Sequence, residues 1–454
     1  MNQILSDAAA RATRYLADIQ TRTVAPSPAA IAALRAFDEA LPAGPTDPAD
    51  TLRLLDETGS PATMGMAGPR FFGFVIGGSL PVTLGANWLA GAWDQNAALY
   101  RATPGVAHLE QVTLRWLLDV LKLPAGCSGA FVTGATVANL CALAAARHAV
   151  LRRAGWNVEA QGLFGAPSVT VIVGEEVHPS VTKSLGILGL GRSRVTKVPV
   201  DGQGRMRVDR LPAISGPTIV CVQAGNVNTG AFDPIAEICA KAHAAGAWVH
   251  VDGAFGAWAA AAPSRAHLAA GMAEADSWAT DAHKWLNVPY DSGLAFVHDA
   301  HALQAAMAIT AEYLPTQTEQ RNPGDFTPEL SRRARGVEVW AALRSLGRAG
   351  LAEMIERNCA QARRFADKLR VGGCEVLNDV VLNQVLVAFG DAERTKHVIE
   401  AVQKDGTCWA GITVWQGRTA MRISVSSWAT TDADVDRSVA AILKVAAVGE
   451  PREH

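Results

Sequence analysis

The sequence predicts an α/β fold in which helices cover both faces of a mostly parallel sheet. Short β-rich runs alternate with helical segments between residues 105 and 300, and this strand–helix–strand order is typical of parallel sheets. A chain of 454 residues is also long enough for one large domain with smaller attachments. In sheets of this kind, ligands bind beyond the carboxyl ends of the strands.

The first segment, residues 1–66, is predicted to form helices that proline-rich turns interrupt. Its apolar positions include Ile31, Leu34, Phe37 and Leu41, which need a partner to cover them. Alone, this segment would make a poor domain. We therefore expect it to wrap a larger body, such as a second subunit.

The second segment, residues 67–338, is predicted to be the large domain. Helical patterns cover 106–123, 136–154 and 235–245. The predicted strands are 168–173, 218–222, 247–251 and 293–297.

The third segment, residues 339–454, has a different pattern. A long helix is predicted over 339–369, followed by a strand over 384–389, another helix and a strand over 420–425. This order indicates a smaller α+β domain.

The composition excludes several classes of protein. Apolar residues make up 49% of the chain and charged residues 19%, with a formal net charge of −2, so neither disorder nor nucleic-acid binding is expected. No run of about 20 apolar residues predicts a membrane span, and the first 20 residues lack the apolar middle of a signal peptide. The seven cysteines are scattered without a C-x-x-C pair, which favours reduced thiols in the cytoplasm and no metal site.

An acidic residue, Asp252, stands at the end of a predicted strand in His250-Val-Asp-Gly-Ala-Phe255. A carboxylate at this place is costly to bury unless it is paired or solvated. It can cap the following helix, or it can keep the ring nitrogen of an aromatic cofactor protonated and so make the ring an electron sink. The residue alone favours the cap.

Lys284 follows 32 residues later, in Asp281-Ala-His-Lys-Trp285. Apolar tryptophans beside a lysine remove water from its ammonium form, which favours a nucleophilic amine. The alternative is a surface lysine whose stem covers Trp285. Lys284 and Asp252 together are stronger evidence for a cofactor than either residue alone.

Two further motifs have weaker signals. The run Gly129–Leu140 leads from an extended stretch into an alanine-rich helix, and Ala135 and Thr136 are small enough for backbone amides to approach a phosphate. His178 follows the strand that ends at Val173, where it could stack on a flat cofactor or be a structural histidine.

Together, these motifs resemble the group II pyridoxal-phosphate-dependent decarboxylases, the family of aromatic-amino-acid and glutamate decarboxylases. The resemblance runs in order from about Phe71 to Trp428. It implies the aspartate-aminotransferase fold (fold type I), pyridoxal 5'-phosphate as cofactor, and an obligate homodimer with active sites at the interface.

The resemblance also implies roles for particular residues. Lys284 would hold the cofactor as a Schiff base, Asp252 would pair with the ring nitrogen, and His178 would stack on the ring. Ala135, Thr136 and His283 would bind the phosphate. The implied cofactor-binding set is Ala135, Thr136, His178, Asn226, Asn228, Asp252, Ala254, His283 and Lys284.

Two positions depart from the family pattern. Val227 stands where the family has a hydroxyl near the cofactor, and we expect Asn226 and Asn228 to compensate. Asp281 places an acid beside the expected phosphate, so we expect its side chain to point away.

The substrate entrance is expected along residues 71–100 by resemblance. This stretch contains Phe72, Phe74 and Trp93, and its only charged residue is Asp94. Without a local Lys or Arg, a second substrate carboxylate has no partner, so an aromatic or other non-acidic amino acid is favoured. The alternative is that these aromatic residues only form core.

Arg422 opens a late strand, where enzymes of this fold often bind the substrate carboxylate. A structural pair between domains is the alternative for this residue.

The predicted reaction is decarboxylation. The family carries a tyrosine on a mobile loop that returns a proton, but residues 316–329 contain none, and Pro323 stands at that position. Tyr313 or His178 could supply the proton. Otherwise the chain is a retro-aldol lyase or an oxidative deaminase (aldehyde synthase) on the same scaffold. A cofactor-binding protein with weak activity is the third possibility, and the intact Lys284 and Asp252 argue against it.

Overall fold

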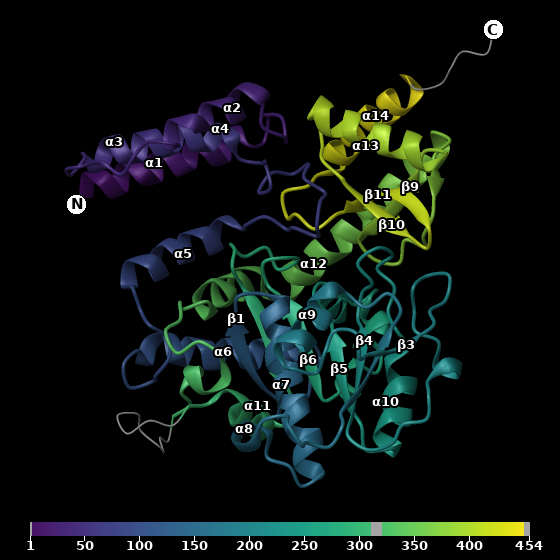
Figure 1. Cartoon of the computed structure of the whole chain (residues 1–454). Helices are drawn as coiled ribbons and strands as arrows, with labels where there is room; N and C mark the ends of the chain where they lie inside the picture. The colour runs from purple at the N-terminus through teal and green to yellow at the C-terminus, as the bar shows by residue number, and fades with distance from the viewer. Residues whose placement is uncertain (1, 310–319, 449–454) are drawn as a thin grey trace. The chain divides into compact units, whose positions relative to one another are not determined.

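The computed structural model describes residues 2–309 and 320–448 of the chain (Figure 1). These residues form two compact units. Unit 2 contains Ser79–Ala360 and Asn378–Gln384. Unit 1 groups the residues up to Gly78 with Gln361–Leu377 and the residues from Val385 on.

Unit 2 is built on a seven-stranded sheet with the order β1-β7-β6-β5-β4-β2-β3. Strands β2 to β6 pair in parallel, whereas β7 lies antiparallel between β1 and β6. The strands are β1 Ser128–Val132, β2 Thr170–Gly174, β3 Thr196–Val198, β4 Thr218–Gln223, β5 Trp248–Asp252, β6 Ser277–Asp281 and β7 Gly293–Val297. The mostly parallel sheet predicted from the sequence is thus confirmed.

The helices of unit 2 cover this sheet, except α5, which lies away from the strands (Figure 1). They are α5 Pro81–Trp93, α6 Pro104–Val120, α7 Ala135–Arg153, α8 Val158–Gln161, α9 Pro179–Ile187, α10 Ile235–Ala244, α11 Ala300–Met307 and the first part of α12 Gly336–Val371. Helix α7 lies against β1 and β4 to β7. Its buried face carries small residues, among them Ala138, Cys141 and Ala145, which let the helix approach the sheet closely.

The carboxyl ends of the parallel strands meet at one edge of the sheet. There β5 ends at Asp252 and β6 ends at Asp281. Strand β1 runs in the same direction as β6, because β7 is antiparallel to both, so the turn from β1 into α7 lies at the same edge. This edge is where the predicted motifs come together.

Some elements differ from the sequence predictions. Strand β6 was not predicted because Ser277-Trp-Ala-Thr-Asp281 mixes polar and apolar residues, although all five residues are buried. Helix α12 is not continuous, because Gly347 interrupts it with a positive φ of 59° and an extended ψ of −174°. No helix in the described part of the chain is long and apolar enough to cross a membrane.

Unit 1 contains a four-stranded sheet with the order β10-β11-β9-β8. Its elements are α1 Asn2–Asp18, α2 Pro28–Ala33, α3 Pro48–Leu54, α4 Ser60–Ala62, the end of α12, β8 Glu375–Val376, β9 Gln384–Ala388, α13 Ala392–Asp405, β10 Gly411–Trp415, β11 Arg418–Ser424 and α14 Asp432–Val448. This division differs from the predicted segments 1–66, 67–338 and 339–454, which stay a prediction about folding domains.

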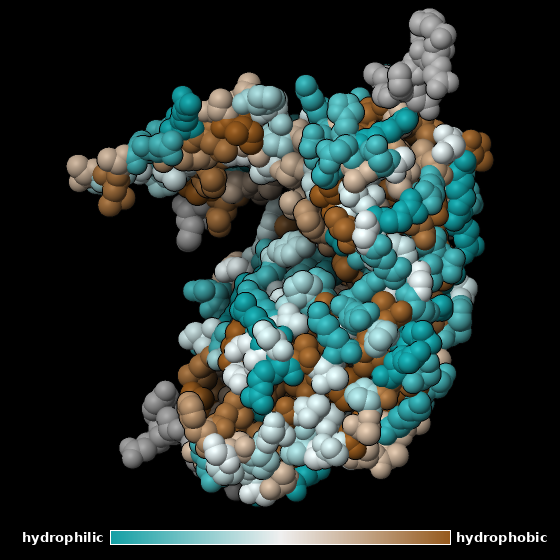
Figure 2. Space-filling model, turned by 45° about the vertical axis from the view of Figure 1, so that its right-hand side comes forward, coloured by the Kyte–Doolittle hydropathy of each residue, from teal (hydrophilic) through white to brown (hydrophobic). Residues whose placement is uncertain are grey.

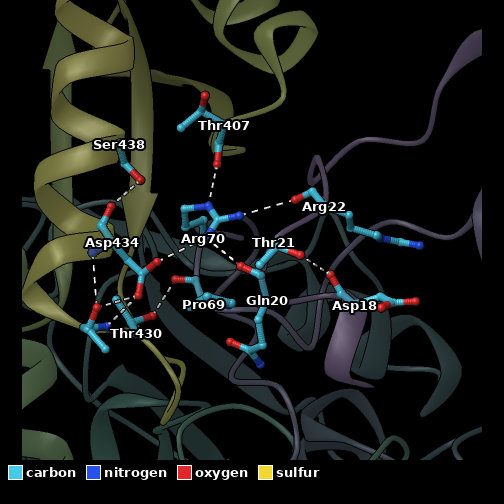
Figure 3. A network of polar contacts seen from close by, with 11 residues as sticks. Asp18, Gln20, Thr21, Arg22, Pro69, Arg70, Thr407, Thr430, Asp434 and Ser438 are labelled. Atoms are coloured by element: carbon cyan, nitrogen blue, oxygen red, sulfur yellow. Dashed lines mark hydrogen bonds and ion pairs between the residues drawn. The ribbon is translucent and has the colours of Figure 1, made fainter. Parts of the chain in front are cut away.

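The buried guanidinium of Arg70 links distant parts of unit 1 (Figure 3). It donates to the carbonyls of Gln20 (3.0 Å), Arg22 (3.3 Å) and Thr407 (2.8 Å). It also pairs with Asp434 at 3.1 Å, on the first turn of α14. A buried charge needs such a full set of acceptors, so Arg70 anchors the chain that follows α1 to the C-terminal helices.

The N-terminal helices of unit 1 and the loop before α3 expose apolar side chains, some of which are visible in Figure 2. The exposed fractions are 48% for Ile31, 40% for Phe37, 94% for Leu41 and 60% for Leu55. Such a group of exposed apolar residues is typical of a surface that binds a partner.

Candidate active site

A pocket in unit 2 lies at the carboxyl edge of the sheet. It brings together most of the predicted cofactor-binding residues. Those that line it are Ala135, Thr136, His178, Asp252, Ala254, His283 and Lys284. They come from segments about 150 residues apart in the sequence, and the strand order of the sheet places them side by side.

Lys284 lies in the turn after β6, and its side chain is 19% exposed. Its Nζ lies 3.0 Å from Oδ2 of Asp281. The next residue, Trp285, is fully buried, and its indole N–H donates to Oδ1 of Asn358 at 3.0 Å. Trp285 thus holds the turn, while Lys284 lines the pocket.

Asp281 points into the pocket, which corrects the expectation that it points away. Its Oδ1 accepts a hydrogen bond from the backbone N–H of Ala135 at 2.5 Å, and its side chain is 2% exposed. The reason is the geometry of the sheet: β6 ends beside the N-terminus of α7, where an anion satisfies free backbone amides. The carboxylate therefore occupies part of the predicted phosphate-binding site (below, the phosphate cradle) formed by Ala135, Thr136 and His283.

The close approach of α7 to the sheet depends on Gly293. Gly293 pairs with both Val132 of β1 and Asp281 of β6. A Cβ atom at Gly293 would clash with the backbone of Gly134, just before α7. Any larger residue would push the helix N-terminus away from the pocket.

His283 is held on two sides. Its Nδ1 accepts a hydrogen bond from the backbone N–H of Ser292 at 3.0 Å, and its ring stacks on Tyr290 with centroids 4.2 Å apart. The Nε2 atom lies 3.5 Å from Oδ1 of Asp281. Burial lowers the pKa of His283, and the neutral ring then presents an Nε2–H donor to the pocket.

Asp252 is the last residue of β5 and is 5% exposed. Its Oδ1 accepts from the backbone N–H of Ala254 at 3.2 Å, and its Oδ2 accepts from Nδ2 of Asn139 at 3.4 Å. The carboxylate thus both holds the turn after β5 and lines the pocket, so the two roles considered for it are compatible.

His178 caps the N-terminus of α9 and also lines the pocket. Its Nδ1 accepts from the backbone N–H of Ser180 at 3.2 Å and lies 2.7 Å from the Ser180 hydroxyl. These contacts fix the ring orientation. The same side chain thus caps a helix and lines the pocket.

Asn226 and Asn228 are absent from the pocket lining, whereas Val227 is part of it. The Oδ1 of Asn226 accepts from the backbone N–H groups of Asn228 and Thr229, and its Nδ2 donates to Glu176 at 2.9 Å. Asn226 therefore shapes the turn that carries Val227.

The predicted substrate residues lie outside this pocket lining. Phe72, Phe74 and Arg422 belong to unit 1, and Trp93 ends α5 in unit 2. Phe72 is buried, Phe74 is 57% exposed, and burial lowers the pKa of Arg422. Their role in substrate binding stays a prediction, and Tyr313 lies outside the described residues.

Three polar residues were missed by the sequence analysis: Ser180 and Gln223 line the pocket, and Asn139 contacts Asp252 behind it. Asn139 lies one helical turn after Ala135 in α7, and Ser180 lies in the first turn of α9. His250 and Asp252 are two residues apart in β5 and so lie on the same face of the strand. That alternation is the signal that could have linked His250 to the site.

The family model for the pyridoxal-dependent decarboxylase conserved domain matches residues 34–390, which is most of the chain. The chain belongs to this family. Its cofactor is therefore pyridoxal 5'-phosphate, and it is a lyase that releases CO2.

Curated relatives agree with this assignment. The chain is 28% identical over 417 residues to tryptophan decarboxylase 1 of Oryza sativa subsp. japonica, covering 83% of this chain and 80% of that protein. It is also 28% identical over 338 residues to an aromatic-L-amino-acid decarboxylase of Bacillus atrophaeus, covering 72% and 68% of the two chains.

Solved structures confirm the predicted fold type I. The structure of Oryza sativa TDC with PLP and tryptamine superposes with a TM-score of 0.91 at 24% identity, covering 98% of this chain and 97% of that chain. The structure of mouse CSAD superposes with a TM-score of 0.90 at 21% identity, covering 98% of each chain.

The residues of the pocket fit this cofactor chemically. A primary amine, a carboxylate, an imidazole and the N-terminus of a 19-residue helix surround one space. The backbone N–H of Ala135 already donates to an anionic oxygen, that of Asp281, which shows that this helix end accepts an anion.

Proposed function

We propose that the chain decarboxylates an aromatic or other non-acidic L-amino acid in this pocket. The observation that carries the proposal is the charge of the lining. Lys284 is the only Lys or Arg among the described lining residues, and the lining also contains two carboxylates, Asp252 and Asp281. A second substrate carboxylate would therefore find no cation in this lining besides Lys284, which is assigned to the cofactor, and it would add a like charge to an acidic lining.

The names of the relatives support an aromatic substrate. Tryptophan decarboxylase 1 and aromatic-L-amino-acid decarboxylase are both among them. An acidic amino acid decarboxylase from Mus musculus is also similar, at 29% identity over 315 residues. The charge of the pocket lining favours the aromatic class over the acidic class.

We assign four roles to residues of the pocket. Lys284 attaches the cofactor through its amine, and Asp252 pairs with the ring nitrogen. His178 covers one face of the ring, and His283 donates its Nε2–H to the phosphate together with the amides at the start of α7. When bound, pyridoxal phosphate supplies the conjugated ring that accepts the electron pair of the breaking bond to the carboxylate.

The return of a proton to the substrate carbon needs a donor at the pocket. Pro323 is buried in the short helix Pro323–Phe326, and no tyrosine lies among residues 320–329. Among the described residues, His178 lines the pocket and carries a ring that can hold a proton at Nε2 while Nδ1 accepts from Ser180. We therefore assign the proton-donor role to His178.

The test is the product balance on a panel of L-tryptophan, L-tyrosine, L-phenylalanine, L-glutamate and L-aspartate. The proposal expects one amine and one CO2 per aromatic substrate, with turnover of the acidic substrates at least tenfold lower. Aldehyde with ammonia and peroxide from an aromatic substrate would favour the oxidative alternative. Aldehyde with glycine from a β-hydroxy amino acid such as L-threonine, added to the panel for this purpose, would favour a retro-aldol lyase. Faster turnover of glutamate than of tryptophan would contradict the substrate class.

We also propose that the chain forms a homodimer in the cytoplasm. The N-terminal segment and α5 expose large apolar side chains, including Leu41 (94%) in the loop before α3, and Trp88 (44%) and Trp93 (45%) on α5. A second copy is the natural cover for such surfaces in this family. All seven cysteines lie among the described residues and are thiols outside any disulfide, which suits a reducing compartment.

A further inference from the structure

His250 and Asn139 form a buried chain of hydrogen bonds that ends on Asp252. Both side chains are fully buried, and neither lines the pocket. Nε2 of His250 lies 2.8 Å from Oδ1 of Asn139, whose Nδ2 donates to Oδ2 of Asp252 at 3.4 Å. On its other side, Nδ1 of His250 lies 2.9 Å from the hydroxyl of Ser277, a fully buried residue of β6.

The direction of these hydrogen bonds follows from the partners at the two ends. Trp248 has only an N–H to offer, and it donates to Oγ of Ser277 at 2.8 Å. The Ser277 hydroxyl then donates to Nδ1 of His250, which leaves the ring proton on Nε2. That Nε2–H donates to Asn139, and Asn139 donates to Asp252.

All four hydrogen bonds therefore point toward the same carboxylate. Aligned hydrogen bonds polarise one another, which favours Nδ2 of Asn139 as a donor to Asp252 at their separation of 3.4 Å. Burial lowers the pKa of His250 to about 3, so the ring stays neutral and the direction does not reverse at ordinary pH.

Asn139 also connects Asp252 to His178, the residue predicted to stack on the cofactor ring. Its Nδ2 lies 3.2 Å from Oγ of Ser180, and that hydroxyl lies 2.7 Å from Nδ1 of His178. One buried amide thus contacts both the carboxylate of Asp252 and the serine that orients His178.

We propose that Asn139 and His250 are positioning residues that hold Asp252 against the ring nitrogen of the cofactor and set the orientation of His178. This proposal rests on the role of Asp252 given under the proposed function. This chain of hydrogen bonds from Trp248 to Asp252, called the relay below, explains why a histidine stands two residues before Asp252 without reaching the pocket.

The experiment compares two cofactors on the cofactor-free chain. One is pyridoxal phosphate, and the other is its carba analogue, in which CH replaces the ring nitrogen. Binding is measured by absorbance titration for wild type, Asn139→Leu, His250→Phe and the double variant. A structural defect weakens both ligands alike, whereas a defect at the ring nitrogen weakens only the first.

Wild type is expected to prefer pyridoxal phosphate over the analogue. That preference should fall about tenfold in each single variant, because a buried hydrogen bond to a charged group is lost or misaligned. In the double variant, the preference for pyridoxal phosphate should fall no further than in the single variant with the greater loss, since both residues act through one chain of hydrogen bonds. Unchanged preference in Asn139→Leu and His250→Phe, or additive losses, would overturn the proposal.

Three further variants serve as a control, as a test of the role of Asp252, and as a smaller substitution in the hydrogen-bond chain. Asn383→Leu removes an equally buried amide outside the pocket lining and should keep the preference. Asp252→Asn should abolish it; if it does not, the role of Asp252 itself is wrong, rather than the relay alone. Should either larger substitution fail to fold, Ser277→Ala removes only a hydroxyl of the relay, and a preference equal to wild type would then count against the proposal.

Discussion

Replacement of Asp281 by asparagine should tighten the binding of pyridoxal phosphate. The Asp281 carboxylate accepts the backbone N–H of Ala135 at 2.5 Å and lies 3.0 Å from Nζ of Lys284. A phosphate at the start of α7 has to share or displace this carboxylate, and it is repelled by the negative charge. An asparagine side chain at this position would keep an acceptor of the same shape without the charge.

The size of the effect follows from the kind of hydrogen bond that is exchanged. A hydrogen bond to a charged group contributes about 1.5–3 kcal/mol, and a neutral one about 0.5–1.5 kcal/mol. Asp281→Asn should therefore lower the cost of displacement by about 1.4 kcal/mol, which is about tenfold in the dissociation constant. The cofactor-free variant should also melt at a lower temperature, because the buried pair with Lys284 is lost.

The assay is an absorbance titration of cofactor-free protein with pyridoxal phosphate and, separately, with pyridoxal. The gain should appear with the phosphorylated ligand and be absent with pyridoxal, which has no phosphate to be repelled. Asp276→Asn is the matched control, because Asp276 also accepts a backbone N–H, that of Val249 at 2.7 Å, but does not line the pocket. It should leave the affinity for both ligands unchanged.

Two results would refute this reasoning. If Asp281→Asn binds pyridoxal phosphate more weakly than wild type, the carboxylate supports the phosphate cradle instead of competing with it. If the gain is the same for pyridoxal, the effect acts on Lys284 or the ring and not on the phosphate.

Further predictions concern the cofactor, the dimer and acid stability. Asp252→Ala should fold but lose more than tenfold in turnover, and a loss of less than tenfold, about 1.4 kcal/mol, would remove its role. Trp88→Glu should shift the protein toward half the wild-type mass in light scattering, since this exposed side chain lies on α5. Because burial lowers the pKa of His250 to about 3 from 6.5, its contribution to stability is present above pH 6.5 and is lost as the pH falls toward 3. When the pH is lowered to about 5, the free energy of unfolding of His250→Gln should therefore fall by about 2 kcal/mol less than that of wild type, measured by urea unfolding.

The class of fold could be predicted because alternating strands and helices appear directly in the order of residues. The strands β2, β4, β5 and β7 were found this way. Asp252 and Lys284 were singled out instead from their motifs and the family resemblance, and both line the pocket. Strand β6 was missed, because its polar residues are satisfied only by tertiary partners such as Trp248 and His250.

The orientation of Asp281 could not be predicted for a similar reason. It depends on the distance between the end of β6 and the start of α7, which Gly293 keeps short. The link between Asn139 and Asp252 joins residues 113 positions apart, and local sequence patterns carry no signal for such a pair.

The attachment of the cofactor to Lys284 tests the central claim most directly. Purified protein loaded with pyridoxal phosphate is reduced with borohydride, digested and mapped by mass spectrometry. The account predicts one phosphopyridoxyl label, on the peptide that contains Asp281-Ala-His-Lys-Trp285, and none in Lys284→Ala. A label on another lysine, or an unlabelled wild-type protein that still decarboxylates, would contradict it.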